Sequence, residues 1–198
     1  MAPGFGKLRE PVLRLTAALR ALGAKSDSGR FLIGTTDDPG SQLGQSPLRS
    51  PSVFNFYRPG YVPPGTEAGA AGLTVPEMQL THETSVAGYA NYMRAGVQAG
   101  FGLRGTSPAR ADVQLSLDDL RSRADDASAL VQRACALLLG AQANAALQAE
   151  MVAAVQSVAV PALKTSPCNQ AAIDTARNNR VWMAAYLALV SPEFIVQK

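Results

Sequence analysis

A lone histidine beside a glutamate is the pair of residues in this sequence best suited to proton transfer. His82 is the only histidine of the chain, and Glu83 follows it directly. The unperturbed pKa of histidine lies near neutrality, so the pair could act in general acid–base catalysis. Arg49 could hold a carboxylate, phosphate or sulfate through two parallel hydrogen bonds. These three residues are the candidate catalytic group, and they would suit a hydrolase or a transferase.

Three residues near Arg49 are the candidate ligand-binding group, namely Asn55, Tyr57 and Arg58. A plainer interpretation exists for both groups. The sequence THETS before a helix supplies N-terminal capping groups and favourable acidic charge. Arginines in a loop of aromatic residues and prolines commonly bond to backbone carbonyls and stack on rings. The sequence favours this structural interpretation and leaves enzymatic activity open.

The two cysteines, Cys135 and Cys168, do not form a CxxC pair. A structural zinc site usually needs four cysteine or histidine ligands, so we expect no metal. The glycine-rich stretch QAGFGLRGTSP carries no GxGxxG after a predicted strand and no GxxxxGK[ST], so we predict neither a phosphate-binding role nor a cofactor. Cys135 lies in the apolar run ACALLLG, which is typical of a small buried side chain. The two cysteines are either separate buried thiols or, in an oxidising compartment, a disulfide that closes a loop of about 34 residues.

The composition is that of a globular chain of one ordinary domain or two small ones. The chain has 198 residues, of which 47% are hydrophobic and 17% are charged, against a typical charged fraction of ~25%. A net charge of +3 is too small to indicate nucleic-acid binding. The sequence contains neither an apolar run long enough for a transmembrane segment nor a signal peptide. Taken alone, the chain would therefore be cytoplasmic.

Helical periodicity predicts the elements that must position these residues. We expect one helix over residues 10–22, a second over 84–94 and a helical bundle over 110–198. The glycine-rich stretch 98–108 is predicted to be a loop. Because alternation of period two is nowhere sustained, the predicted fold class is all-α, with about five helices.

A long irregular segment separates the first two predicted helices. Residues 23–79 contain seven of the thirteen prolines, and they carry little helical pattern. Within them, the stretch SPSVFNFYRPGYVPPG holds four aromatic residues, more than a flexible linker usually carries. Prolines lower the entropy that is lost on ordering. We therefore predict an ordered loop over residues 44–64 whose aromatic rings pack into a core.

Four runs of sequence carry a family resemblance. In chain order they are GKLREPVLRLTAALRALGA, GQSPLRSPSVFNFYRPGYVPPG, PEMQLTHETSVAGY and LVSPEFIVQK. These runs resemble the C-terminal part of a bacterial family catalogued as number 1800 among the domains of unknown function (DUF 1800). Members of that family are usually longer, with a signal peptide and a large helical N-terminal portion, and no reaction is established for them.

The resemblance implies a context for the chain. We expect residues 1–198 to form a single helical unit, the C-terminal portion of an exported periplasmic or extracellular protein whose N-terminal half is missing here. Its expected partners are that missing half and a sulfatase-like exported protein encoded nearby. We expect an uncharacterised binding or assembly scaffold; the alternative is an exported hydrolase or transferase whose cleft is shared with the missing half. The apolar stripe of the first helix needs cover, so we expect the isolated chain to associate or aggregate.

Overall fold

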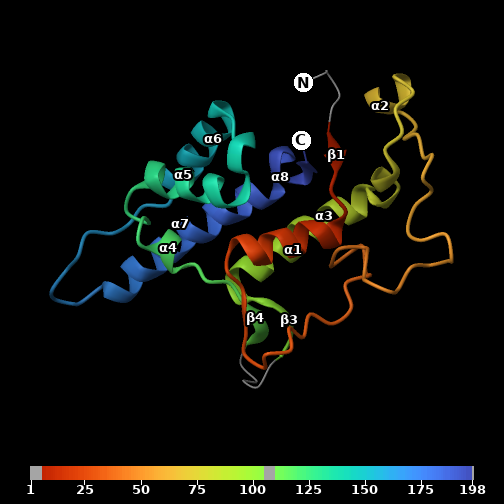
Figure 1. Ribbon diagram of the computed structural model, residues 1–198. Helices are drawn as coiled ribbons and strands as arrows, with labels where there is room; N and C mark the ends of the chain where they lie inside the picture. The colour runs from red at the N-terminus through yellow and green to blue at the C-terminus, as the bar shows by residue number, and fades with distance from the viewer. Residues whose placement is uncertain (1–5, 105–109, 198) are drawn as a thin grey trace.

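The computed structural model describes residues 6–104 and 110–197, which form a mixed α/β fold (Figure 1). Within this part of the chain there are eight α-helices, two short 3-10 helices and five strands. The α-helices are α1 (Pro11–Ala21), α2 (Glu67–Ala70), α3 (Glu83–Ala99), α4 (Asp118–Arg121), α5 (Ala127–Leu138), α6 (Ala145–Gln156), α7 (Gln170–Val190) and α8 (Pro192–Ile195). The 3-10 helices are η1 (Pro76–Leu80) and η2 (Gly140–Gln142). The strands are β1 (Lys7–Leu8), β2 (Lys25–Ser26), β3 (Phe101–Arg104), β4 (Ala111–Gln114) and β5 (Val196–Gln197).

The long helix α7 is the centre of the core. It packs against α3, α5 and α6, and it lies between them in Figure 1. Its buried face combines large side chains such as Val181 and Leu189 with Ala184, Ala185 and Ala188. Alanine favours the helix and leaves little bulk between neighbouring helices. Burying Val181 or Leu189 contributes roughly 1.5–3 kcal/mol each.

The helices predicted from periodicity are present, with α3 longer than expected. Helix α1 begins at Pro11, whose missing N–H costs nothing in the first turn. Helix α3 continues through residues 84–94 to Ala99 and ends at Gly100, whose φ of 87° lies in the left-handed region. Near the start of α3, a Cβ on Gly88 would lie 2.1 Å from the carbonyl oxygen of Pro39. The glycine thus lets the irregular segment lie directly on the helix.

The prediction of an all-α fold is wrong, because five short strands form two antiparallel sheets. Strands β1 and β5 pair the two ends of the described chain, and β2, β4 and β3 form a three-stranded sheet in that order. Each strand is only two to four residues long. Alternation of period two needs about four to eight residues to be recognised, so the sequence carried no signal for these strands.

The glycine-rich stretch 98–108 contains part of this sheet. It was predicted to be a loop, but its residues Phe101–Arg104 form β3; residues 105–108 lie outside the described chain. Strand β3 pairs with β4 and shows a register shift along its length. Such an irregularity further obscures the alternation on which a strand prediction depends.

The segment 23–79 that was predicted to be irregular contains β2, α2 and most of η1, and its aromatic rings do not all reach a core. Residues 27–66 contain neither helix nor strand. Phe56, Tyr57 and Tyr61 are half-buried, whereas the Phe54 side chain is 80% exposed. The prediction that these rings pack into a core is therefore wrong for Phe54. The segment runs along one edge of the molecule, away from α5–α7 (Figure 1).

Candidate functional site

His82 and Glu83 lie at the start of α3, where they serve the helix. The Nδ1 atom of His82 accepts a hydrogen bond from the Ser85 amide at 3.3 Å, and the Ser85 hydroxyl accepts one from the His82 amide at 2.9 Å. This reciprocal pair is a capping box, and it satisfies two backbone donors. Glu83 is exposed in the first turn, where acidic charge favours the helix dipole. The capping groups predicted for THETS are therefore present, with His82 as the cap.

Arg49 has a partner of its own in the irregular segment. Its Nε donates to a carboxylate oxygen of Asp37 at 2.7 Å, and this hydrogen bond holds the pKa of Asp37 below its usual value. Among the described residues, no hydrogen bond or ion pair joins Arg49 to His82 or to Glu83. The structure therefore records no shared catalytic constellation for the three residues.

The predicted ligand-binding residues anchor the irregular segment instead. The Tyr57 hydroxyl hydrogen-bonds Glu10, and burial together with this carboxylate raises the pKa of Tyr57. The Arg58 amide donates to the side-chain oxygen of Gln79 at 2.9 Å. Asn55 is exposed and has a φ of 72°, a left-handed conformation that asparagine tolerates better than most residues.

Gln45 connects the irregular segment to the start of α1. Its Nε2 donates to Glu10 at 2.6 Å, and its Oε1 accepts from the Val12 amide at 3.2 Å. Helix α1 has no side-chain cap from its own N-cap residue. The irregular segment thus supplies an acceptor that the helix N-terminus needs.

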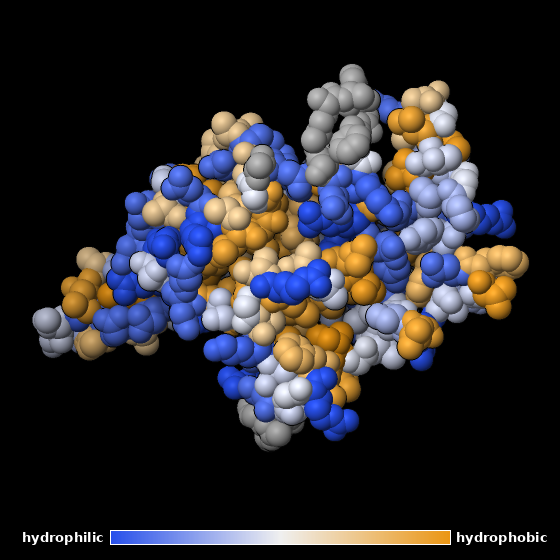
Figure 2. All heavy atoms as spheres, viewed as in Figure 1, coloured by the Kyte–Doolittle hydropathy of each residue, from blue (hydrophilic) through white to orange (hydrophobic). Residues whose placement is uncertain are grey.

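Three large apolar side chains between Gln45 and Tyr57 are exposed to solvent. The exposed fractions are 105% for Leu48, 95% for Val53 and 80% for Phe54. We call these three residues the apolar tip. Leu48 also has a φ of 60°, which a branched apolar side chain adopts only where the surrounding structure holds it. Figure 2 shows hydrophobic side chains along the edge of the molecule where the irregular segment runs.

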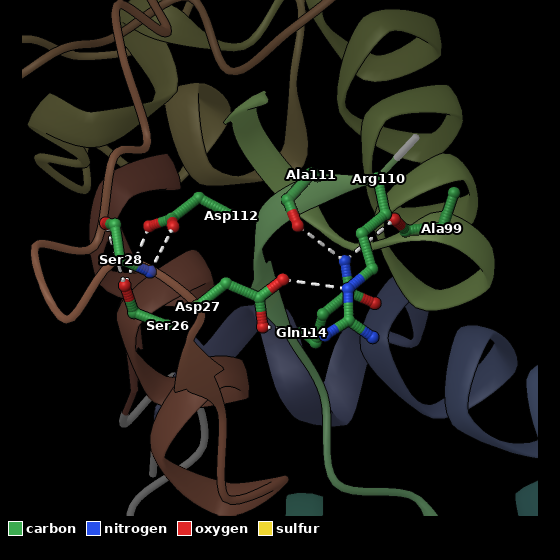
Figure 3. Close-up of polar contacts among 8 residues, drawn as sticks. All are labelled: Ser26, Asp27, Ser28, Ala99, Arg110, Ala111, Asp112 and Gln114. Atoms are coloured by element: carbon green, nitrogen blue, oxygen red, sulfur yellow. Dashed lines mark hydrogen bonds and ion pairs between the residues drawn. The ribbon is translucent and has the colours of Figure 1, made fainter. Parts of the chain in front are cut away.

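Asp112, which no sequence pattern singled out, organises the three-stranded sheet (Figure 3). Its buried carboxylate accepts hydrogen bonds from the Ser26 hydroxyl at 2.7 Å and from the amides of Ser28 and Leu32 at 2.8 and 2.9 Å. Burial alone would raise the pKa of Asp112, but these hydrogen bonds lower it to about 2. Nearby, the Arg110 guanidinium donates two hydrogen bonds of 2.8 Å to the Asp27 carboxylate. Asp112 thus fixes the first turns of the irregular segment on β4.

A groove of about 380 Å³ lies where α3 and α7 meet. Its lining includes Arg94 and Gln98 of α3 and Asn179, Trp182 and Tyr186 of α7. Its volume lies at the lower end of the range for small-molecule sites. Nothing in its lining points to one chemical class of ligand.

The cysteines are separate thiols in this structure, Cys135 buried and Cys168 exposed. The Cys135 sulfur lies 3.8 Å from the sulfur of Met151, and burial raises the pKa of the Cys135 thiol. A buried thiol of this kind is a poor nucleophile, because the thiolate is the reactive form. In residues 6–104 and 110–197, no group of three or more histidine, cysteine or acidic side chains could hold a metal ion.

The fold and the candidate site define a mainly helical α/β protein that presents an apolar tip on an anchored loop. The chain belongs to the family described as "Protein of unknown function (DUF1800)", whose family model matches residues 1–196. Comparison with the curated proteins and with the solved structures gave no match. Among the described helices, none is long and apolar enough to cross a membrane.

Proposed function

We propose that this chain is a binding or assembly module that docks through the apolar tip onto another protein. The observation that carries the proposal is the near-complete exposure of Leu48, Val53 and Phe54 within seven residues of one loop. Single exposed apolar residues are common on protein surfaces, but clustered ones mark interaction sites.

Contacts before, within and after the apolar tip support this proposal. Gln45 before the tip and Tyr57 after it are both held by Glu10, and Arg49 within it is held by Asp37. Ordering a loop on binding costs conformational entropy, so a loop that is anchored beforehand binds more tightly. Burial of each tip side chain in a partner would contribute roughly 1.5–3 kcal/mol, before the cost of association is subtracted.

The resemblance suggests which partners to test. They are the N-terminal portion of a longer parent protein and a sulfatase-like exported protein, and export of the parent is part of this proposal. The alternative of a shared hydrolase or transferase cleft has less support, because His82 uses its Nδ1 to cap α3 and Arg49 is paired with Asp37.

Site-specific photo-crosslinking in cells tests the docking function. A photoreactive phenylalanine analogue replaces Phe54, and in a matched control it replaces Leu163, whose side chain is 64% exposed elsewhere in the chain. We expect one discrete product from position 54, identified by mass spectrometry as one of the two proposed partners. The product should disappear when Leu48→Ser and Val53→Ser are added.

Three results would overturn the docking function. They are no discrete product from position 54, the same products from both positions, or a product that survives the serine substitutions. If the product contains only a second copy of this chain, the apolar tip mediates self-assembly and not docking on a different protein.

A further inference from the structure

A buried arginine without a carboxylate partner lies inside the fold. The Arg14 side chain is only 6% exposed, and its guanidinium carbon lies 5.1 Å from the centre of the Tyr89 ring. Its Nε donates to the backbone oxygen of Arg9 at 2.8 Å. Within the described residues, neither an ion pair nor a hydrogen bond from its two terminal nitrogens is recorded. Arg14 therefore carries a buried positive charge that the described residues do not neutralise.

The Arg14 side chain lines a small cavity of about 90 Å³ where α1, α3, α8 and the irregular segment meet. A single water needs only about 10–15 Å³ of such space, so the cavity has room for several heavy atoms. Much of the remaining lining is aliphatic and comes from Leu43, Leu80, Val86 and Ile195. The cavity thus combines one cationic group with apolar walls.

Buried charges are costly unless a counter-charge and hydrogen bonds compensate them. Burial lowers the pKa of Arg14; Tyr89 opposes this effect, and the neighbouring charge of Arg9 adds to it. Arginine nevertheless stays protonated in proteins, so the charge persists. The nearest acidic residue in the sequence, Glu10, already accepts hydrogen bonds from Gln45 and Tyr57. An anion in the cavity would supply the missing counter-charge.

The other polar groups of the cavity narrow the class of anion. The Ser85 hydroxyl donates to backbone oxygens of Leu80 and His82, and the Tyr89 hydroxyl donates to the backbone oxygen of Leu189. Thr81 also lines the cavity and adds one neutral hydroxyl group. Arg14 is then the main donor, with its two terminal nitrogens forming one fork. A carboxylate can satisfy both of its oxygens on such a fork. A phosphate or a sulfate would leave further oxygens against aliphatic walls, which is unfavourable.

We propose that this cavity binds a small aliphatic carboxylate, with the carboxylate on the terminal nitrogens of Arg14 and the alkyl chain against the aliphatic walls. The Tyr89 ring and the bond from Nε to Arg9 hold the guanidinium plane in place for this contact. The site is separate from the apolar tip, and the proposal does not depend on the docking function.

Butyrate is the probe for this site, and equilibrium dialysis and thermal unfolding at constant ionic strength are the measurements. We expect butyrate to bind one per chain and to raise the melting temperature in a saturable way. Butyramide, which has nearly the same shape without the charge, and inorganic phosphate should bind at least tenfold more weakly. If butyrate does not saturate, or if butyramide or phosphate binds as well as butyrate, the proposal is wrong.

Substitutions on α1 distinguish binding in the cavity from a general effect of charge on butyrate binding. Arg14→Met should weaken butyrate binding at least tenfold, because it removes the fork with little change in volume. Arg20→Met removes the same charge from the exposed face of α1 and should change binding less than twofold. Equal affinities in the two variants would overturn the proposal. If Arg14→Met does not fold, Arg14→Lys keeps a buried cation without the fork and should still bind more weakly than the wild type.

Discussion

Gly96 of α3 lies against the ring of Phe101, and this contact allows a quantitative prediction. A Cβ at position 96 would lie 1.9 Å from Cε1 and 2.1 Å from Cζ of that ring. The ring would have to retreat by about 1.5 Å to reach an ordinary contact of 3.4 Å. It has little room, because Phe101 is 1% exposed and its centroid lies 5.5 Å from that of Tyr92. Gly96→Ala therefore forces the core to rearrange.

Two opposing effects set the magnitude for Gly96→Ala. Overpacking a core costs about 1–3 kcal/mol, and complete loss of a buried phenylalanine ring costs about 3–5 kcal/mol. Alanine in place of glycine in a helix returns about 1 kcal/mol. We expect the free energy of unfolding to fall by about 2 kcal/mol, which lowers the melting temperature by about 4–8 °C in a chain of this size.

Urea unfolding and thermal melting are the assays for this contact. The control is Gly60→Ala, because a Cβ there would meet nothing within 4 Å; its effect should stay within about 0.5 kcal/mol. Adding Phe101→Leu to Gly96→Ala should cost less than the two single losses combined, since the clash is relieved. A Gly96→Ala protein as stable as the wild type would refute the reasoning.

Three further predictions follow from single polar groups. The pKa of Asp112 is about 2 in the folded state, below the usual unfolded value of ~3.9. The Asp112 carboxylate therefore stabilises the fold above pH ~4, and this contribution is lost as the pH falls towards ~2. Acid titration of unfolding should show that Asp112→Asn removes this part of the pH dependence. Within the described chain the buried Tyr92 hydroxyl has no hydrogen-bond partner, and burial raises its pKa to about 12. Tyr92→Phe should therefore raise the free energy of unfolding by up to ~1 kcal/mol in urea titrations, and a lower free energy of unfolding would contradict this. His82→Ala should cost about 1 kcal/mol in the same assay, whereas His82→Asp, a better cap, should match or exceed the wild type.

The sequence predicts those helices that neighbouring residues in the chain begin and stabilise. Helix α1 follows from Pro11 and from apolar residues at helical spacing, and the start of α3 follows from THETS. Strands β1, β2 and β5 escaped prediction because pairing with distant segments, and not alternation, stabilises them. Asp112 illustrates this, since its partner Ser26 lies 86 residues away in the sequence.

Arg14 escaped prediction for a different reason. Helix α1 contains two arginines, Arg14 and Arg20, and periodicity alone cannot tell which of them turns inward. The direction is set by Tyr89, which lies 75 positions later and receives the guanidinium on its ring. The candidate residues that the sequence did single out, among them His82 and Tyr57, are instead used to cap a helix and to anchor the irregular segment.

Cover for the apolar stripe of α1 comes from within the chain. Leu15 and Leu22 are 4% and 2% exposed, so this stripe gives the chain no reason to aggregate. Apolar side chains are left exposed instead at the apolar tip, which lies on a loop that polar contacts hold outside the helical core. Because the tip side chains contribute little to the core, selection for folding alone would favour polar residues at these positions. Under the docking proposal, polar substitutions at these positions should therefore abolish binding and leave the free energy of unfolding nearly unchanged.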